Sequence, residues 1–362
     1  MKRRKLRVAV LFGGKSGEHE VSLASARSVM EAMDKSKYEI YPIGITKEGY
    51  WLLHGDPMAV LSAGKKGDRL PSGREGELIP GLLGRDFPQV DVVFPVLHGT
   101  YGEDGTIQGL LELADLPYVG AGVLGSALGL DKAVQKVVLR AHGLPVVDYK
   151  VYLRSRWQQD PERILAEIEE HFAYPVFVKP ANLGSSVGVS KAHHREELRK
   201  GLDLAARFDR KLLVEEGVNA REIECSVLGN DEPIASVPGE VVPCNEFYDY
   251  KAKYLDGSSE LHIPAELEEE QRIAIQRFAV EAFRAIDCAG MARVDFFLCR
   301  DTGKVYINEL NTIPGFTEIS MYPKLWEASG IPYPELIDRL IGLALERYEE
   351  KKALETVYRF DH

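Results

Sequence analysis

The stretch "ARVDFFLCRDTGKVYINELNTIPGF", residues 292–316, has two mainly apolar runs on either side of "DTG". This pattern is typical of a β-hairpin, and a three-residue loop at 301–303 would place Gly303 where such loops favour a left-handed backbone. The second strand then ends in Glu309 and Asn311, whose side chains lose their hydration on burial unless a partner replaces the water. The hairpin therefore raises the question of what that partner is.

With this loop, counting back along the two strands places Asp295 opposite Glu309. Arg293 is then opposite Asn311, and the strand period of two puts all four side chains on one face. Opposed Cβ atoms lie about 5 Å apart, so the two carboxylates repel each other unless a cation lies between them. Since every ligand offered is an oxygen, the sequence predicts a site for Mg²⁺ or Mn²⁺ rather than for zinc.

The alternative interpretation of this hairpin is a solvated edge whose polar side chains face water. A one-residue bulge would also break the register. The convergence of three oxygen ligands and an arginine on one face favours the metal site.

The whole chain has 362 residues, which predicts two or three domains of roughly 150 residues each. Its 45% hydrophobic residues and mean hydropathy of -0.19 are typical of a soluble globular protein. The net charge of -11 argues against a general binder of nucleic-acid backbones. No apolar stretch approaches the ~20 residues that span a membrane, and no cleavage site follows the N-terminal apolar run. The cysteines lack metal-type or redox-type spacing, so we expect a cytoplasmic protein with reduced thiols.

The first third of the chain alternates strands and helices, which is the pattern of an α/β fold with an open parallel sheet. A strand at 6–12, for example, is followed by Leu23, Ala26, Met30 and Met33 at helical spacing. The rest of the chain has a mixed α+β pattern. We predict three units, with the bounds 1–128, 129–214 and 215–362.

The segment "GGKSGEHEVS", residues 13–22, contains Gly-Lys-Ser but is no P-loop, because the first glycine of that motif is replaced by Ala9 within a strand. What remains is a turn from the carboxyl end of a strand into a helix, where open α/β sheets bind small ligands. Glu18 lies in the opening of this helix. It either stabilises the helix dipole or holds a ligand ammonium, and the residues alone leave both possibilities open.

The segment "VKPANLGSSVGVS", residues 178–190, is a stronger signal. It puts Lys179 at the end of an apolar strand, followed by a loop of glycine and serine. An ammonium group, backbone N–H groups and hydroxyls can together close over phosphate oxygens. A plain hairpin turn would not explain the lysine.

Other candidate residues are individually weaker signals. Glu215 and Glu222 could accept hydrogen bonds from an adenine and a ribose, but a salt-bridged surface turn explains them almost as well. His98 opens the Gly-rich loop "LHGTYGEDG" and is equally well explained as structural or functional. Lys132 and Lys253 carry little weight alone, because most lysines are solvated.

Taken together, six segments resemble, in order and spacing, the D-alanine:D-alanine ligases of the ATP-grasp superfamily. They are "GGKSGEHEVS", "LHGTYGEDGTIQG", "KPANLGSSVGVSK", "EFYDYKAKY", "RVDFF" and "NELNTIPGFTEISMYP". The resemblance runs nearly end to end. It implies a three-unit ATP-grasp architecture, with ATP between the second and third units and the amino acids facing the first.

The resemblance also assigns roles to matching residues. Those that would contact ATP are Lys132, Lys179, Gly184, Ser186, Glu215, Glu222 and Lys253. Lys132, Lys179 and the loop would hold the phosphates, and the two glutamates would hold adenine and ribose. Those that would bind two Mg²⁺ (or Mn²⁺) ions are Asp295, Glu309 and Asn311. Those that would act on the amino acids are Glu18, His98, Ser185, Tyr254, Arg293, Gly315 and Ser320.

Within the last group, Glu18 would hold the ammonium of the first D-alanine. Arg293 and the backbone N–H of Gly315 would face the developing oxyanion, while Ser320 and Lys253 would help with the second carboxylate and the transferred phosphate. The implied reaction converts the first D-alanine to an acyl phosphate, which the amine of the second D-alanine attacks. Positioning and charge neutralisation supply most of the rate in such transfers, and Ser185 is assigned an orienting role only.

The resemblance further implies a homodimer and a role in making peptidoglycan precursors. Tyr254 would join Ser185 and Glu18 in a hydrogen-bonded chain, and its presence in the loop favours an amine acceptor over the hydroxyl of D-lactate. Two alternatives remain. One is an ATP-grasp ligase for another acceptor, such as D-serine or D-lactate, and the other is a nucleotide-binding regulator without turnover.

Overall fold

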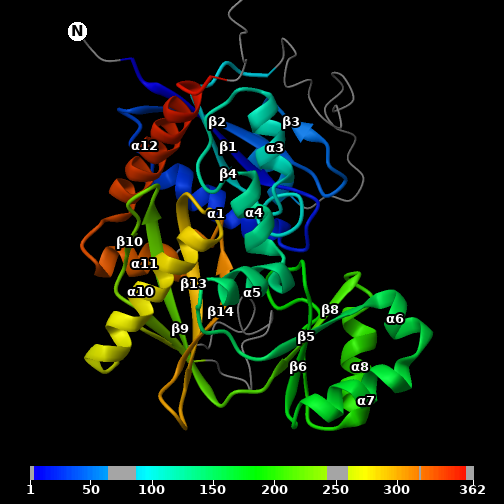
Figure 1. Cartoon of the computed structure of the whole chain (residues 1–362). Coiled ribbons are helices and arrows are strands. Elements are labelled where there is room, and N and C mark those ends of the chain that lie inside the picture. Colours follow the sequence, from blue (N-terminus) through cyan, green and yellow to red (C-terminus); the bar gives the residue numbers. More distant parts are fainter. Residues whose placement is uncertain (1–3, 64–86, 243–259, 318, 356–362) are drawn as a thin grey trace, which may run out of the picture.

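The structure is a computed structural model that describes residues 4–63, 87–242, 260–317 and 319–355. Its strands form three separate sheets, each with its own helices (Figure 1). The first sheet lies at the top of that view, the third below it, and the second to the lower right. Among the described residues, no helix combines the length and the apolar character needed to cross a bilayer.

The first sheet has the order β3-β2-β1-β4. Its strands are β1 (Leu6–Gly13), β2 (Tyr38–Ile45), β3 (Trp51–Leu52) and β4 (Val92–Val96). β1 is parallel to β2 and β4, while β3 is an antiparallel edge, so the predicted open parallel sheet is confirmed. Residues 8–12 of β1 are completely buried, as expected for a strand that is covered on both faces.

The helices that follow these strands are α1 (His19–Ala32), α2 (Pro57–Ser62), α3 (Thr106–Leu113), α4 (Val123–Leu130) and α5 (Lys132–Ala141). Helix α5 begins directly after Asp131, whose side chain accepts a hydrogen bond from the backbone N–H of Val134 and so caps the helix. It packs against α4 and the second sheet. This position brings the side chains of α5 close to both of the other sheets.

The second sheet is antiparallel with the order β5-β8-β6-β7. Its strands are β5 (Tyr149–Leu153), β6 (Val176–Pro180), β7 (Ser190–Ala192) and β8 (Lys211–Glu216). The helices α6 (Arg154–Gln159), α7 (Pro161–His171) and α8 (Arg195–Ala205) share one apolar core with it. The "NLGSSVGV" segment, residues 182–189, connects β6 to β7 and is called the phosphate loop below.

The third sheet has the order β12-β11-β9-β13-β14, with β10 attached to β9. Its strands are β9 (Ala220–Gly229), β10 (Ile234–Ala235), β11 (Gly239–Val242), β12 (Glu260–His262), β13 (Gly290–Cys299) and β14 (Val305–Asn311). Helix α10 (Glu269–Ala285) packs on it, followed by α11 (Met321–Ala328) and α12 (Tyr333–Lys352). Helix α12 contacts β9 and β13 of this sheet and also buries Leu336 and Leu340 in the core of the first sheet.

The hairpin of β13 and β14 corrects one prediction and confirms another. Cys299 pairs with Lys304, so the loop comprises residues 300–303 and is one residue longer than predicted. The ladder then shifts by one residue at Asn308, a β-bulge that restores the predicted register. Asp295 therefore does lie opposite Glu309. Gly303 has the expected positive φ, 68°.

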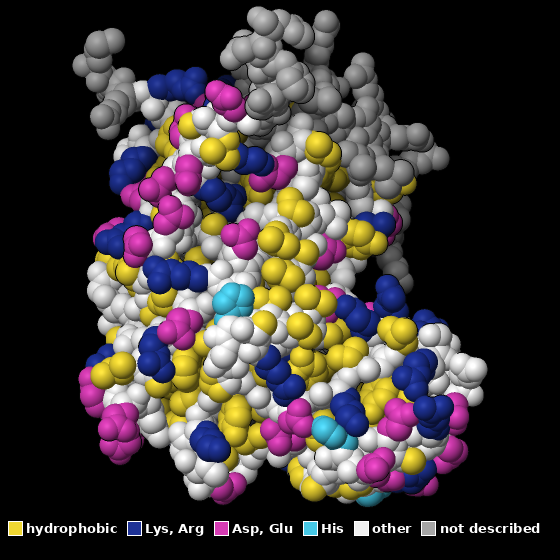
Figure 2. Space-filling model, in the orientation of Figure 1, with side chains coloured by type: hydrophobic (Ala, Val, Ile, Leu, Met, Phe, Trp, Pro, Cys, Tyr) yellow, Lys and Arg dark blue, Asp and Glu magenta, His cyan; other side chains and the backbone are white. Residues whose placement is uncertain are grey.

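The surface of the molecule carries both signs of charge. Figure 2 shows acidic and basic side chains interspersed over the visible face, with apolar side chains gathered over the region of α4 and α5. Leu124 on α4 and Val137 on α5 have exposed fractions of 56% and 58%. Such a patch is a candidate contact surface.

Candidate active site

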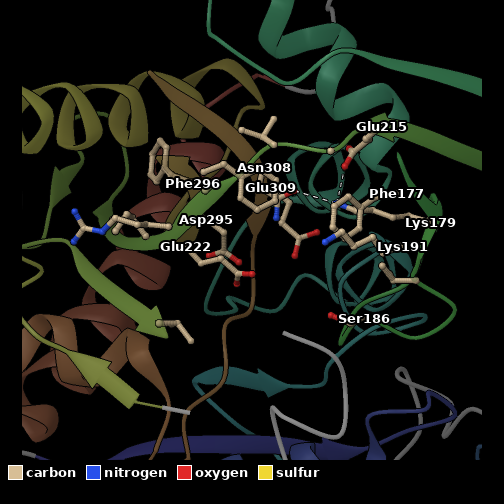
Figure 3. A pocket seen from close by; sticks show the side chains of 18 of the residues that line it. Phe177, Lys179, Ser186, Lys191, Glu215, Glu222, Asp295, Phe296, Asn308 and Glu309 are labelled. Carbon is tan, nitrogen blue, oxygen red and sulfur yellow. Dashed lines mark hydrogen bonds and ion pairs between the residues drawn. The ribbon is translucent and has the colours of Figure 1, made fainter. Parts of the chain in front are cut away.

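A cavity of about 700 Å³ lies between the second and third sheets. Its lining includes most of the residues that sequence reasoning assigned to ATP and metal, namely Lys132, Lys179, Gly184, Ser186, Glu215, Glu222, Asp295 and Glu309. Figure 3 shows Lys179 and Lys191 on one side of this space and Glu222 and Asp295 on the other. Residues from units far apart in the sequence therefore meet around one cavity.

The predicted metal ligands lie next to one another at the end of the hairpin. Asn311 Nδ2 donates to Asp295 Oδ2 at 3.0 Å, and Arg293 holds both carboxylate oxygens of Asp295 at 2.7 Å. Glu309 Oε2 lies 3.0 Å from Lys132 Nζ. The protein's own cations thus offset the repulsion between the two carboxylates in this structure.

These residues fit Mg²⁺ when part of the coordination comes from a nucleotide. No group of three or more His, Cys, Asp or Glu side chains in the described ranges could hold a metal ion by itself. Mg²⁺ in phosphoryl-transfer sites, however, is bound by one or two carboxylates together with substrate phosphates and water. Asp295 and Glu309 both line the cavity, which is consistent with that arrangement.

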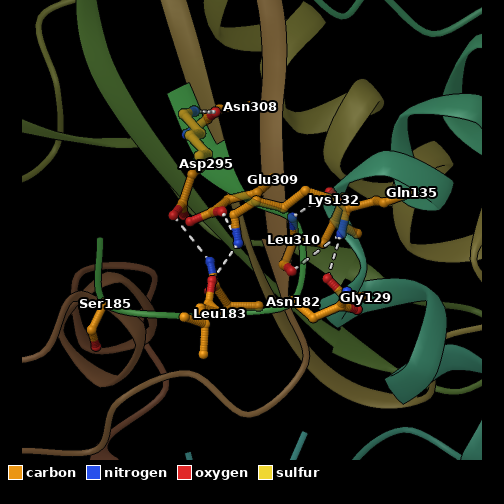
Figure 4. Close-up of polar contacts among 12 residues, drawn as sticks. Gly129, Lys132, Gln135, Asn182, Leu183, Ser185, Asp295, Asn308, Glu309 and Leu310 are labelled. Carbon is orange, nitrogen blue, oxygen red and sulfur yellow. Dashed lines mark hydrogen bonds and ion pairs between the residues drawn. The ribbon is translucent and has the colours of Figure 1, made fainter. Parts of the chain in front are cut away.

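Lys132 connects the metal residues to the phosphate loop, as Figure 4 shows. Besides its ion pair with Glu309, its Nζ donates to the carbonyl oxygen of Leu183 at 2.8 Å. Burial works against the charge on this lysine, but the attraction of Glu309 and of Glu215 outweighs it and raises the pKa of Lys132. The lysine is therefore charged where phosphates would lie.

Glu215 is almost completely buried, with an exposed fraction of 1%. Burial alone would raise its pKa, but Lys136 and Lys179 lie 2.9 and 2.6 Å from its two oxygens and lower the pKa to about 2. The carboxylate is therefore ionised at every physiological pH. Sequence reasoning predicted Glu215 as an adenine partner and did not anticipate this double ion pair.

Glu18 reaches from the first unit to the phosphate loop. It caps α1 only by position, because its side chain makes no capping hydrogen bond, and it accepts a hydrogen bond from the Ser185 hydroxyl instead. A Cβ atom on Gly184 would lie 2.5 Å from Glu18 Oε2, so a larger residue there would displace the Glu18 carboxylate. Ser185 and Ser186 both have positive φ, which L-residues seldom adopt.

His98 lies behind this contact rather than in the lining of the cavity. Its two ring nitrogens are 3.0 Å from the Ile313 carbonyl oxygen and 3.2 Å from the Ser25 hydroxyl. Burial lowers the pKa of His98, so the ring is neutral near pH 7. It joins the loop after β4 to the loop after β14.

Glu103 makes a similar connection that sequence reasoning missed. Its two carboxyl oxygens accept hydrogen bonds from the backbone N–H groups of Gly99 (2.7 Å) and Ile313 (3.1 Å). Burial, followed by the nearby charge of Glu18, raises its pKa to about 8. The "GEDG" segment was visible in the sequence, but nothing in it indicated that the glutamate is buried.

Arg293, Gly315 and Ser320 do not line the cavity. Arg293 lies between Asp295 and Glu224, and Glu224 Oε2 is 2.9 Å from Arg293 Nε. Burial acts to lower the pKa of this arginine, but the two carboxylates outweigh burial and raise it. A Cβ atom on Gly315 would lie 2.7 Å from the Ser320 hydroxyl. Lys253 and Tyr254 lie outside the described residues.

Three further residues of this region were not predicted. Glu224 faces Asp295 across β9 and β13. Asn308, the bulge residue, lines the cavity and accepts a hydrogen bond from Lys179 Nζ at 3.3 Å. Lys136 follows Lys132 by one helical turn. Two signals in the sequence could have indicated Glu224 and Lys136. Glu222 and Glu224 alternate along a strand and so share a face, and Lys132 and Lys136 have the four-residue spacing that puts side chains on one face of a helix.

Two sheets that enclose a Gly/Ser loop, lysines and carboxylates form the arrangement of a ligase with the ATP-grasp fold. Comparison with known proteins identifies the family. The model described as "D-ala D-ala ligase N-terminus" matches residues 7–121, and "D-ala D-ala ligase C-terminus" matches residues 138–342. The chain belongs to the D-alanine–D-alanine ligase family.

Individual relatives match over nearly the whole chain. A curated D-alanine–D-alanine ligase of Natranaerobius thermophilus is 53% identical over 354 residues, which cover 96% of this chain and 97% of the relative. The solved D-alanine-D-alanine ligase of Coxiella burnetii is 40% identical with a TM-score of 0.78 and 96% coverage of both chains. The VanG D-Ala:D-Ser ligase of Enterococcus faecalis is 37% identical with a TM-score of 0.81, covering 94% of this chain and all of that one.

Proposed function

We propose that this protein joins two D-alanines to D-alanyl-D-alanine at the expense of ATP, through a D-alanyl phosphate, for peptidoglycan precursor synthesis. One observation carries the proposal. Glu18 of the first unit, the phosphate loop of the second and the carboxylates of the third meet at one place, with Ser185 in contact with Glu18. An enzyme that must bring an amino acid to the γ-phosphate of ATP needs this convergence.

ATP would lie in the 700 Å³ cavity. Glu215 and Glu222 would accept hydrogen bonds from adenine and ribose, while Lys132, Lys179 and the phosphate loop would hold the phosphates. When bound to Asp295, Glu309 and Asn311, Mg²⁺ supplies charge neutralisation and alignment of the phosphate oxygens. The residues of the chain therefore position the nucleotide and carry no covalent intermediate.

The amino acids would lie between this cavity and the first unit. Glu18 would bind the ammonium of the first D-alanine, whose carboxylate oxygen attacks the γ-phosphorus as ADP leaves. The amine of the second D-alanine then attacks the acyl carbon, loses a proton, and phosphate departs. Arg293 and the N–H of Gly315 would stabilise the oxyanion formed in that step, and the closed phosphate loop would exclude water.

We further propose a cytoplasmic location and a homodimer. Cys225, Cys288 and Cys299 are all free thiols, which suits a reducing compartment. The exposed apolar side chains of Leu124 and Val137 on neighbouring helices offer a surface for a second copy. Sedimentation of wild type and of the double variant Leu124→Ser, Val137→Ser would test the dimer, which should dissociate more readily in the variant.

The experiment that tests the activity is a coupled assay of ADP release with a panel of amino acids. We expect release that depends on D-alanine and not on L-alanine. Mass spectrometry of reactions containing equal D-alanine, D-serine and D-lactate then identifies the acceptor. A dominant D-alanyl-D-serine or D-alanyl-D-lactate product would replace the proposed acceptor, and release without any amino acid would contradict ligation.

A further inference from the structure

Lys136 is a lysine buried where no solvent reaches it; burial lowers its pKa, and the ion pair with Glu215 opposes that effect and favours the charged form. It lies on α5, its side chain is 1% exposed, and it does not line the cavity. A lysine is almost never fully buried unless it is paired, because removing an ammonium from water is costly. This residue therefore needs an explanation that an ordinary surface lysine does not.

Lys136 does not line the cavity, but two of the residues that it contacts do, Glu215 and Asn308. Its Nζ is 2.9 Å from Glu215 Oε1 on β8 and donates to the carbonyl oxygen of Asn308 on β14 at 3.2 Å. The ring of Tyr149 lies 6.0 Å away. One ammonium thus joins α5 to the second and third sheets.

Lys179 shares the same carboxylate but differs in its access to the cavity. Its Nζ lies 2.6 Å from Glu215 Oε2, its side chain is 10% exposed, and it lines the cavity, as Figure 3 shows. Glu215 carries one negative charge against the two positive charges of the lysines. Since Lys136 cannot reach the cavity, the positive charge left over is available on the cavity side, at Lys179.

We infer that Lys136 is a positioning residue that neutralises Glu215 from behind and so keeps the charge of Lys179 available for nucleotide phosphates. Without Lys136, Glu215 would be balanced by Lys179 alone, and the excess positive charge facing the phosphates would disappear. In a poorly hydrated site, loss of one such charge matters more than it would in water. This inference rests on the proposed use of ATP.

The competing explanation is that Lys136 only stabilises the packing of α5. The two explanations differ in what they predict for ligands of different charge. If Lys136 balances charge, its loss lowers the affinity for ATP and ADP but leaves the affinity for adenosine, which has no phosphate, nearly unchanged. A purely structural role affects all three alike or none of them.

The first experiment measures the binding of ATP, ADP and adenosine to Lys136→Met by calorimetry. Methionine keeps an unbranched side chain of similar length and removes the charge. We expect the affinity for ATP and ADP to fall about tenfold or more, and that for adenosine to change by less than about twofold. Lys200→Met, which removes an exposed lysine on α8, is the matched control and should bind all three ligands like wild type.

The second experiment restores the charge balance. Glu215→Gln, combined with Lys136→Met, removes the carboxylate together with the ammonium that neutralised it and retains an oxygen acceptor for adenine. The double variant should recover ATP affinity to within about threefold of wild type, so the two substitutions are strongly non-additive. Additive losses would overturn the inference.

The outcomes also separate this inference from the proposed function. Failure of the wild type to bind ATP would contradict the proposed function itself. Binding of ATP by the wild type and equally by Lys136→Met would leave that function intact and reject the role of Lys136. If the single variant does not fold, the double variant decides, because it removes the Glu215 carboxylate together with one of its two ammonium partners. Weak ATP binding by the folded double variant would reject the inference.

Discussion

Glu309 is the residue on which the proposed chemistry depends most directly. It lies opposite Asp295 in the hairpin and pairs with Lys132, which also contacts the phosphate loop. We expect Glu309→Gln to abolish turnover while leaving the fold intact, because the neutral amide removes one negative charge from the metal-binding set. Steady-state ADP release across a range of Mg²⁺ concentrations measures the effect.

The control for this substitution is Glu335→Gln, which changes an exposed carboxylate on α12 that pairs with Arg339. It should retain wild-type activity and the same Mg²⁺ requirement. Near wild-type turnover by Glu309→Gln at an unchanged Mg²⁺ requirement would exclude Glu309 from the metal ligands.

Glu215 should make the stability of the protein depend on acid pH. Lys136 and Lys179 hold its pKa near 2 against the effect of burial, whereas the unfolded chain has the ordinary value. A carboxyl with a lowered folded pKa stabilises the protein above its unfolded pKa, and this contribution disappears as the pH falls towards the folded pKa. The free energy of unfolding should therefore be about 3 kcal/mol higher in wild type than in Glu215→Gln above pH 5.

Urea denaturation of both proteins between pH 6 and the lowest pH at which they remain folded measures this difference. The difference should shrink steadily as the medium becomes more acidic, because the protonated glutamate then resembles glutamine. A difference in the free energy of unfolding that stays constant with pH would mean that the two lysines do not lower the pKa of Glu215.

At the residue scale, sequence reasoning was most successful where a local count sufficed. The pairing of Asp295 with Glu309 followed from the hairpin pattern. The loop is one residue longer than assumed, and the bulge at Asn308 offsets this difference in the register. Lys136 could not be assigned in this way, because its partner Glu215 is 79 residues further along the chain and only the packing of α5 brings them together. Burial of a charged side chain depends on tertiary contacts that a local pattern does not contain.

Among the elements, the phosphate loop is the one that we expect to change most on binding. Two backbone hydrogen bonds lie within the loop, Val187 to Gly184 and Val189 to Ser186, and both are long, at 3.2 and 3.3 Å. Segments with few backbone hydrogen bonds open readily and exchange their amide hydrogens quickly. We therefore predict that residues 183–189 exchange rapidly in the free protein and slowly with ATP and D-alanine bound.

Hydrogen exchange followed by mass spectrometry tests this prediction. The adjoining strand β6 is the internal control, since it is paired with β7 and β8 and should exchange equally slowly with and without ligands. Equal exchange of the loop with and without ligands would contradict its role as a cover.

At the element scale, most strands and helices could be predicted because their apolar spacing is regular. The β13–β14 loop shows the limit of this approach. "DTG" predicted three residues, and the structure has four, because Arg300 is held by a backbone hydrogen bond to Asn219 in the neighbouring connection. The bulge at Asn308 is likewise set by contacts with Lys136 and Lys179 on other elements, which no local sequence pattern reveals.

At the scale of the whole molecule, α12 connects the end of the chain to its beginning. Leu340 is completely buried in the same core as Val8 and Val10 of β1. We expect Leu340→Ala to lower the free energy of unfolding by about 2–5 kcal/mol, because it leaves a cavity in that core. Leu354→Ala, at a position that is 67% exposed, should change it little.

Urea denaturation monitored by circular dichroism measures both variants. If the core that α12 shares with the first sheet is a real unit of stability, hydrogen exchange in β1 should accelerate in Leu340→Ala. Unchanged protection of β1 would mean that the first sheet is stable without α12.

The order of the three units could be predicted from the sequence, since each has its own run of strands and helices. The placement of α12 could not, because its apolar face is compatible with any of the sheets. Leu336 and Leu340 pack against the first sheet because of tertiary contacts that a local pattern does not contain. One of these contacts is the hydrogen bond that the Tyr38 hydroxyl donates to Asp338 at 2.7 Å.

The shared core of β1 and α12 has a consequence for how the chain is made. Domains generally fold as they leave the ribosome, beginning at the N-terminus. Here the core on one face of the first sheet, which α1 also covers, is not complete until residues 333–352, near the last to be translated, have emerged. We therefore expect nascent chains arrested before residue 333 to remain sensitive to protease in the first sheet, and full-length chains to become resistant only on release. In this protein, the part that is synthesised first is completed last.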